Sequence, residues 1–335
     1  PQDVEIYEAP LKPLPRFLLK ALWLTLQQAR QWHPDVVLAG SGLTAPLAWL
    51  AARVCGAKVV TYVHGLDISV PHQVYRRLWL PALRRMDRVI ANSSATAELA
   101  RCAGIDPLRI GIVHPGVTLP QNEYDPEAAA RFRTEHGFGG RLLLLSVGRL
   151  TRRKGLREFV TDVLPRVIAH HPDVLLLVVG DAATNALYSE AQTPQLIQAV
   201  ANDAGVGEHI RFLGKLSETD LLAAYQAADI HVFPVQHVPG DPEGFGMVAV
   251  EAAAHGLPTV AIATGGVVDA VADRRSGRLI APGDSIALAD AIAETLSTRN
   301  AMRESCIKFA QAFAWPRFGE AMIGQLDTIA RVKTQ

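Results

Sequence analysis

Short apolar runs alternate with longer amphipathic segments along most of the chain. The runs are rich in valine, isoleucine and leucine, and glycine, proline or a charged residue bounds each of them. A run that is apolar throughout predicts a strand that is buried on both faces of a parallel sheet. We expect ten such strands, within residues 35–40, 57–65, 88–93, 110–116, 141–149, 174–181, 209–214, 229–234, 257–263 and 277–282.

The segments between these runs have the spacing of helices, for example residues 155–172 and 217–229. Repetition of strand, helix and strand predicts doubly wound α/β domains. A polar stretch with prolines and glycines interrupts the repetition, and we place an interdomain linker there, at residues 119–140. The predicted division is a first Rossmann-like domain at 1–118, a second at 141–308, and a helical C-terminal segment at 309–335.

Composition agrees with a two-domain globular protein. The chain has 335 residues, of which 49% are hydrophobic and 20% are charged. Its 33 basic and 33 acidic residues give no net charge, so there is no electrostatic argument for nucleic acid as a partner. The three cysteines lie far apart in the sequence, which favours a reducing cytoplasm over a disulfide framework.

Two glutamates, Glu243 and Glu251, frame a glycine-rich turn and the start of a predicted helix near Gly246. Eight residues of helix would rise ~12 Å, which is the length of a small ligand. Carboxylates accept hydrogen bonds from sugar hydroxyls, and a helix N-terminus attracts phosphate. The pattern fits a sugar diphosphate. It also fits a helix with one solvated cap glutamate and one buried glutamate.

A second candidate site follows the first strand of the second domain. Arg149 leaves the carboxyl end of that strand, and Lys154 precedes a helix. Ligands of open α/β sheets bind beyond the carboxyl ends of the strands, and this pair of cations suits a diphosphate. We expect the intervening Arg152 and Arg153 to be solvated loop charges.

Residues 148–155 and 242–271 together resemble the large "group 1" family of retaining glycosyltransferases, whose hallmark is a pair of glutamates at the spacing of Glu243 and Glu251. Residues 63–65 and 114–117 resemble two further motifs of that family, so the resemblance covers almost the whole chain. It implies the GT-B fold, an α/β architecture of two Rossmann-like doubly wound domains that face each other across a cleft. It also implies a C-terminal helix that crosses back to the N-terminal domain.

The resemblance implies a donor site in the second domain. Arg149 and Lys154 would hold the donor diphosphate, Glu251 would bind the ribose, and Glu243 would bind the hexose. Further donor contacts are implied at the base, the hexose and the diphosphate, by Leu216, Phe245, Gly246, Met247 and Val248.

His64 would face the donor sugar from the other domain. A lone histidine at a strand end is often structural, but the sequence around His64 matches the family motif. The catalytic groups implied by the resemblance are then His64, Arg149, Lys154 and Glu243. Asp67 lies close to this motif and could face the acceptor or act as a turn carboxylate.

The function implied is transfer of a hexose, with retention, to the hydroxyl of a glycan or lipid-linked acceptor. The donor would be a nucleotide diphosphate sugar of the GDP-mannose or UDP-glucose type, because the chain is similar to lipid and polysaccharide mannosyltransferases. We expect neither a metal nor another cofactor. Two alternatives are a GT-B protein that binds nucleotide sugar without transferring it, and an epimerase.

Residues 74–88 mix five arginines with leucines and a tryptophan. Such a segment can lie on an anionic membrane surface, which would place the protein at the inner face of the cell membrane. The alternative is a helix packed on the first sheet with solvated arginines. The chain opens with a segment similar to a later strand of the family's first domain, so we expect the family's opening strand and Gly-Gly loop to be missing here.

Overall fold

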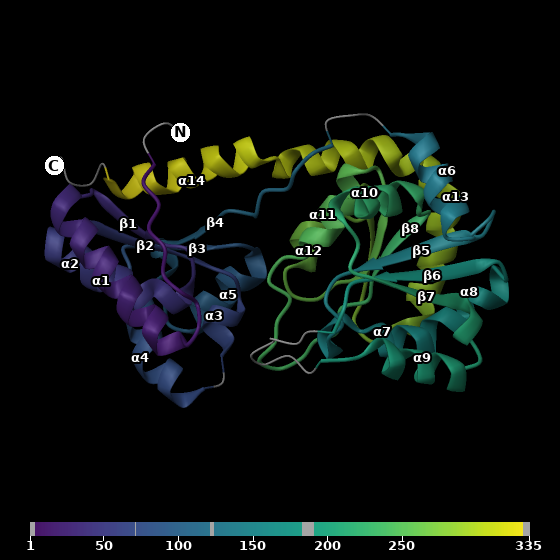
Figure 1. The fold of residues 1–335 in the computed structure, drawn as a ribbon, viewed down its shortest axis with the longest axis horizontal. Coiled ribbons are helices and arrows are strands. Elements are labelled where there is room, and N and C mark those ends of the chain that lie inside the picture. Colours follow the sequence, from purple (N-terminus) through teal and green to yellow (C-terminus); the bar gives the residue numbers. More distant parts are fainter. Residues whose placement is uncertain (1–3, 71, 121–123, 183–190, 331–335) are drawn as a thin grey trace. The chain divides into compact units, whose positions relative to one another are not determined.

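A computed structural model describes residues 4–70, 72–120, 124–182 and 191–330. The chain divides into two compact units, one made of residues 1–114 with 318–335, the other of residues 115–317. Each unit contains one parallel sheet, and every predicted strand region contains a strand (Figure 1). The α/β prediction from the apolar runs is therefore confirmed.

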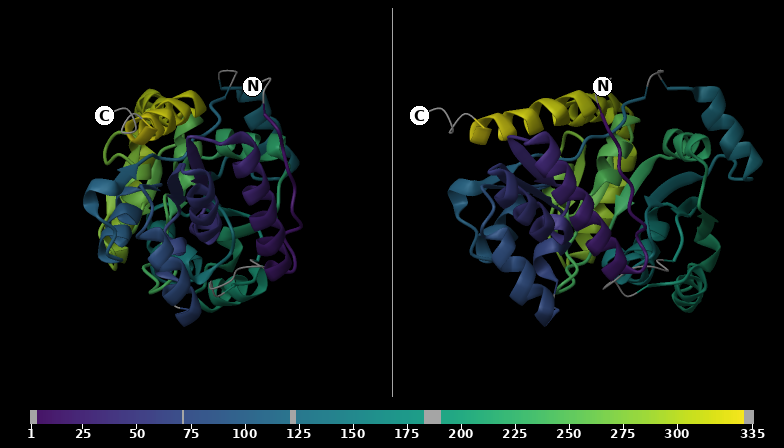
Figure 2. Two further views of the ribbon diagram at one scale, coloured as in Figure 1. Left: turned by 90° about the vertical axis from the view of Figure 1, so that its left-hand side faces the viewer. Right: turned by 60° about the vertical axis from the view of Figure 1, so that its left-hand side comes forward.

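The first unit contains a four-stranded sheet in the order β1-β2-β3-β4. Its strands are β1 (Val36–Ala39), β2 (Lys58–Val63), β3 (Arg88–Ala91) and β4 (Ile110–Ile112). Its helices are α1 (Leu14–Trp32), α2 (Ala45–Cys55), α3 (Leu66–Ser69), α4 (Gln73–Leu83) and α5 (Ser94–Cys102). Figure 2 shows α1 alongside α2, its main contact.

The second unit contains a six-stranded sheet in the order β10-β9-β8-β5-β6-β7. Its strands are β5 (Leu142–Val147), β6 (Val174–Val179), β7 (Ile210–Gly214), β8 (Ile230–Phe233), β9 (Thr259–Ile262) and β10 (Gly277–Ile280). Its helices are α6 (Pro126–Glu135), α7 (Leu156–Glu158), α8 (Leu164–His170), α9 (Pro194–Asp203), α10 (Glu218–Ala227), α11 (Met247–Ala254), α12 (Val267–Ala270) and α13 (Ser285–Ala310).

Helices cover both faces of this second sheet because its central strands are apolar on both faces (Figure 1). Leu144 of β5 and its neighbours pack against α8, α9 and α13. Leu143 and Leu145, which point the other way, pack against α6, α10 and α11. The sheet is thus a doubly wound layer with a complete core on each side.

The predicted linker at 119–140 differs from the structure. The change of unit falls between His114 and Pro115, and α6 is part of the second unit, where Ala129 and Phe132 are buried. The polar composition concealed this helix because only one of its faces is buried. Residues 121–123 of the predicted linker lie outside the described residues.

The C-terminal segment also begins differently from the prediction. Helix α13 continues to Ala310, and α14 spans Trp315–Ala330. Pro316 stands in the first turn of α14, where a missing backbone N–H is tolerated, so it separates the two helices. Phe318 and Met322 of α14 pack with Tyr62 in the core of the first unit. No helix in the described parts of the chain is long and apolar enough to cross a membrane.

Candidate functional site

The strand order of the second sheet defines the place of the candidate site. β5 is paired with β6 on one side and with β8 on the other, so the chain reverses its direction of winding between β5 and β8. In open α/β sheets, ligands bind beyond the carboxyl ends of the strands at such a switch point. The loop after β5 carries Arg149 and Lys154, and the loop after β8 carries Glu243.

These two loops meet in a buried network of charges. Lys154 Nζ lies 2.8 Å from Glu243 Oε2, and Arg153 Nη1 contacts the same oxygen. Arg153 Nε also lies 3.2 Å from Asp241 Oδ1. The four side chains are only 8–15% exposed, and Lys154 lies 4.6 Å from the centre of the Phe233 ring. Two cations and two anions therefore neutralise each other where water is largely excluded.

The network fixes the charge of Glu243. Burial alone would raise the pKa of Glu243, but the positive charges of Lys154 and Arg153 outweigh burial and hold that pKa below its usual value. Burial lowers the pKa of Lys154, and its pairing with Glu243 offsets this only in part. Arg149 is exposed, and its charge also acts on both groups. The site thus presents one cation beyond the balanced network, which favours an anionic ligand.

A glycine-rich turn leads from this network into α11. Gly246 has a φ of 94°, and a Cβ there would lie 2.9 Å from the Phe233 ring. A second loop supports the turn, because Gly266 N–H donates to the carbonyl of Glu243 at 2.9 Å. A Cβ on Gly265 would lie 2.6 Å from that carbonyl oxygen. Only glycine allows this close approach of the two backbones.

The remaining predicted contacts around this turn differ in exposure. The Phe245 side chain is buried against Phe313, with ring centres 5.6 Å apart, so only its backbone can face a ligand. Met247 is 40% exposed, whereas Val248 packs against the core. Leu216, in the loop between β7 and α10, is partly buried against the core.

Glu251 is held apart from the charge network. It lies on α11, and the Tyr225 hydroxyl of α10 donates to its Oε2 at 3.1 Å. Burial raises the pKa of Glu251, and the hydrogen bond from Tyr225 acts in the opposite direction. The structure therefore brings Glu243 and Lys154 together as one charged cluster and places Glu251 in a second, less polar setting.

The expectation that Arg153 is a solvated loop charge is wrong. Arg152 is exposed, but Arg153 is 6% exposed and joins Asp241 to Glu243. No local sequence signal predicts this role, because Asp241 lies 88 residues further along the chain. The alternative of a solvated cap glutamate at position 243 is excluded by the same contacts.

His64 lies in the first unit, just after β2. Its Nε2 is 3.1 Å from the Gly40 carbonyl, which can only accept, so Nε2 is the donor of this contact. The ring meets Tyr62 edge-on, with centres 4.8 Å apart. Asp67 Oδ2 accepts the backbone N–H of His64 at 2.9 Å, so Asp67 serves as a turn carboxylate.

The basic segment is less free than its composition suggests. Arg84 donates to the Ala103 carbonyl, Arg85 lies over the Trp49 ring, and Arg88 donates to Gln325. Arg76 and Arg77 are exposed, and with them two apolar side chains of α4, Val74 and Leu78. In the described residues, no group of three His, Cys, Asp or Glu side chains could hold a metal ion.

Comparison with models of known families shows to which family the chain belongs. The family model "Glycosyl transferases group 1" matches residues 129–313, more than half of the chain. The chain belongs to the group 1 glycosyltransferases. A second model, "Glycosyltransferase Family 4", matches residues 1–120. The family predicted from the two motif loops is thus confirmed.

Relatives within the group 1 family include named glycosyltransferases. The chain is 32% identical to the D-inositol 3-phosphate glycosyltransferase of Mycobacteroides abscessus, over 84% of this chain and 63% of that protein. It is 31% identical to a GDP-mannose-dependent phosphatidylinositol monomannoside mannosyltransferase of Mycolicibacterium smegmatis, over 78% of this chain and 68% of that protein. Among other relatives named D-inositol 3-phosphate glycosyltransferase, the chain spans as little as 49% of the relative's length.

Solved structures confirm the GT-B fold with two Rossmann-like domains. Anabaena HepE in complex with UDP has a TM-score of 0.77 at 22% identity, over 92% of this chain and 82% of that chain. Sucrose-phosphate synthase from Thermosynechococcus elongatus has a TM-score of 0.76 at 23% identity, over 99% of this chain and 83% of that chain. At this level of identity, the likeness concerns the fold.

Proposed function

We propose that the chain provides the donor site of a retaining hexosyltransferase that uses a nucleotide diphosphate sugar. The observation that carries this proposal is the buried Lys154–Glu243 pair at the switch point between β5 and β8, with the exposed Arg149 beside it. An anion, a sugar and a nucleoside would each find a matching group within the second unit. The acceptor would be the hydroxyl of a glycan or a lipid-linked molecule.

Arg149 and Lys154 would bind the diphosphate and stabilise its charge as it leaves the sugar. Positioned cations act most strongly where water is excluded, as it is around Lys154. The Lys154 ammonium has three donors, of which Glu243 takes one. Binding of a diphosphate would also favour the charged form of Lys154, whose pKa burial lowers.

Glu243 would bind hydroxyls of the hexose and not act as a base. Both of its contacts to Arg153 and Lys154 go to Oε2, which leaves Oε1 as an acceptor. A carboxylate whose pKa lies below its usual value is a weak base. We therefore assign Glu243 to sugar binding, and we assign no side chain as a nucleophile.

Glu251 would bind the ribose hydroxyls of the donor nucleotide. Tyr225 holds Oε2 of this carboxylate, and Oε1 is available to accept from a hydroxyl. Leu216 would contact the base, and the backbone of Phe245, Gly246 and Met247 would face the hexose, with Val248 near the diphosphate. Retention implies attack on the same face from which the diphosphate leaves, through an oxocarbenium-like state.

Two nucleotide sugars are candidates for the donor. The name of the mycolicibacterial relative supports GDP-mannose, and the complexes of Anabaena HepE with UDP and UDP-glucose support a UDP-sugar. In the first unit, His64 would contact the transferred sugar through the family motif that it matches. Arg76 and Arg77, with the exposed Val74 and Leu78, would contact an anionic membrane surface.

Product analysis with both donors tests the proposal. We expect release of GDP or UDP from one donor when acceptor glycans or lipids are supplied, and NMR of the product should show the anomeric configuration of the donor sugar. An inverted product would contradict retention. Nucleotide binding without turnover would favour a protein that keeps the donor site but cannot transfer.

A further inference from the structure

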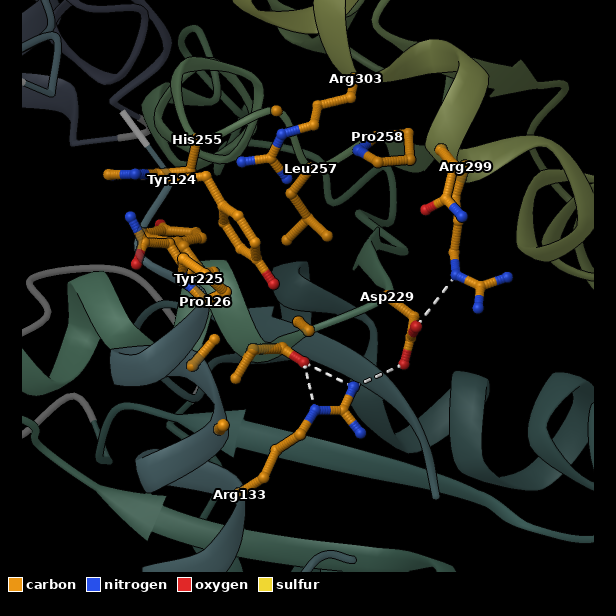
Figure 3. Close-up of a pocket in the computed structure, with 17 residues that line it drawn as sticks. Tyr124, Pro126, Arg133, Tyr225, Asp229, His255, Leu257, Pro258, Arg299 and Arg303 are labelled. Carbon is orange, nitrogen blue, oxygen red and sulfur yellow. Dashed lines mark hydrogen bonds and ion pairs between the residues drawn. The ribbon is translucent and has the colours of Figure 1, made fainter. Parts of the chain in front are cut away.

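A separate pocket lies in the second unit, between α6, the end of α10, the turn after α11, and α13 (Figure 3). Its volume is about 250 Å³. None of the residues assigned to the donor site lines it. Tyr225 lines the pocket and is also the hydrogen-bond partner of Glu251, so one side chain borders both places.

At one end of this pocket, two arginines share a single carboxylate. Arg133 Nη2 lies 2.9 Å from Asp229 Oδ2, and Arg299 Nε lies 2.9 Å from Asp229 Oδ1 (Figure 3). The Leu143 backbone N–H donates to Asp229 Oδ2 as well. Two arginines thus already share the single negative charge of Asp229.

Arg303 lies at the other end of the pocket. Among the residues that the structure describes, no carboxylate lies within ion-pair distance of its guanidinium group, which stacks 4.1 Å from the centre of the Tyr124 ring. Burial, and then the charge of Arg303, lower the pKa of His255 to about 4, so His255 is neutral at physiological pH. The pocket therefore holds three positive charges against one negative charge.

The backbone holds Arg303 in place. Gly256 has a φ of 74°, and a Cβ there would lie 2.6 Å from Arg303 Cγ, so the turn after α11 closes directly over the arginine stem. Stacking on Tyr124 covers a face of the guanidinium plane and leaves its N–H edge, the part that binds oxyanions, for other partners. Arg303 is thus a preorganised cation that no carboxylate of the described residues pairs.

We propose that this pocket binds a small molecule that carries a phosphate monoester, with Arg303 as its charged contact. A planar guanidinium group matches the oxygens of phosphate in a bidentate manner. The volume far exceeds the ~30 Å³ that one water occupies, so it leaves room for a sugar attached to the phosphate. A hydroxyl of that sugar would meet the Tyr124 hydroxyl. This proposal does not rest on the function proposed for the donor site.

Calorimetric titration with inorganic phosphate and with glucose 6-phosphate tests the pocket. We expect the wild-type chain to bind glucose 6-phosphate, and Arg303→Gln to weaken this binding by about tenfold or more, because a charge-assisted hydrogen bond is lost. Arg303→Lys should restore part of the affinity. Arg149→Ala, in the donor site, should leave it unchanged, and a cooperative urea unfolding transition of Arg303→Gln would show that this variant is folded.

A second readout comes from His255 in the wild-type protein. An anion beside Arg303 offsets the charge that lowers the pKa of His255, so saturating glucose 6-phosphate should raise the pKa of this ring as followed by NMR. An unchanged His255 titration, or equal affinity in the wild type and Arg303→Gln, would overturn the proposal. Loss of binding in Arg149→Ala alone would place the phosphate in the donor site and overturn it as well.

Discussion

Lys154 Nζ lies 2.8 Å from Glu243 Oε2, although 89 residues separate the two along the chain. Each residue belongs to a different motif loop, one after β5 and one after β8. The contact therefore joins the part of the site that would hold the diphosphate to the part that would hold the sugar. Removal of either residue should affect both functions.

Coupling between these two residues should be measurable in stability. Lys154→Met and Glu243→Gln each leave a buried charge less well compensated, and each should lower the free energy of unfolding by roughly 1–3 kcal/mol. In the double variant the losses should not add, with a coupling energy on the order of 1 kcal/mol. Urea denaturation of the wild type, the two single variants and the double variant measures this coupling energy. Simple additivity would show that the pair does not interact.

Acid should weaken the same network. Because the pKa of Glu243 in the folded chain lies below its usual value, this group adds stability above its unfolded pKa, near 4.5, and loses it as the pH falls through the folded value. The free energy of unfolding should therefore fall more steeply below pH 4.5 in the wild type than in Glu243→Gln. Denaturation at a series of acidic pH values compares the two, and parallel curves would contradict the assignment.

Arg153 should position Glu243 without touching the nucleotide. We expect Arg153→Met to weaken binding of the complete nucleotide sugar by about tenfold, since Glu243 loses one of its two charged partners, and to leave the affinity for the nucleoside diphosphate nearly unchanged. Its exposed neighbour gives the matched control, Arg152→Met, which should change neither affinity. An equal loss of both affinities in Arg153→Met would indicate a general structural role.

Gly246 should be required for both its conformation and its contact. Gly246→Ala adds a Cβ at a φ of 94° and 2.9 Å from the Phe233 ring, so we expect a loss of about 2 kcal/mol in the free energy of unfolding. Gly283 provides a matched control, because it has a φ of 87° but nothing within 4 Å of an added Cβ. The loss in the free energy of unfolding should be smaller for Gly283→Ala than for Gly246→Ala, with a difference of about 1 kcal/mol. Equal losses would mean that the Phe233 contact is unimportant.

Nucleotide binding should depend on the protonation of Glu251. Because burial raises the pKa of Glu251 above its usual value of 4.5, this carboxyl takes up its proton at a higher pH than a free glutamate does. The protonated carboxyl is a poorer acceptor for the ribose hydroxyls. Affinity should fall as the solution becomes mildly acidic. Tyr225→Phe removes the hydrogen bond that favours the ionised form and should move this loss to higher pH. Calorimetry at several pH values checks both, and a profile that Tyr225→Phe does not shift would contradict the role of this bond.

The contribution of Glu251 to the free energy of unfolding should change with pH in the opposite direction to that of Glu243. A carboxyl whose folded pKa is raised binds its proton more tightly when folded, so its contribution to stability falls as the pH rises through this range. Glu251→Gln should therefore be at least as stable as the wild type at neutral pH. A clear destabilisation there would argue that the carboxylate has an additional structural partner.

Most of the architecture could be predicted from the sequence because its central strands are buried on both faces. The Val/Ile/Leu runs of β5 and β6 have no competing interpretation as surface segments, and the two motif loops directly follow strands. Helix α6 was missed because its buried residues, Ala129 and Phe132, are few among polar neighbours. The apolar signal of a helix buried on one side is weak over ten residues.

The charge network could not be predicted because it depends on strand order. Arg153 and Asp241 come together only because β5 and β8 are neighbours, and one sequence does not specify that pairing. A run of adjacent charges after a strand is usually solvated, and Arg152 follows that rule while Arg153 does not. Lys154 pairs with Glu243 in the structure, and its contact with a ligand phosphate stays a prediction.

The loops after β5 and β8, together with α11, should bind a nucleoside diphosphate. Calorimetric titration of this chain with GDP, UDP, ADP and dTDP, repeated with Arg149→Ala and Glu251→Ala, tests it most directly. We expect one diphosphate to bind clearly and to lose at least about tenfold in affinity in each variant. Absence of binding to all four, or binding that both variants retain, would contradict the donor site.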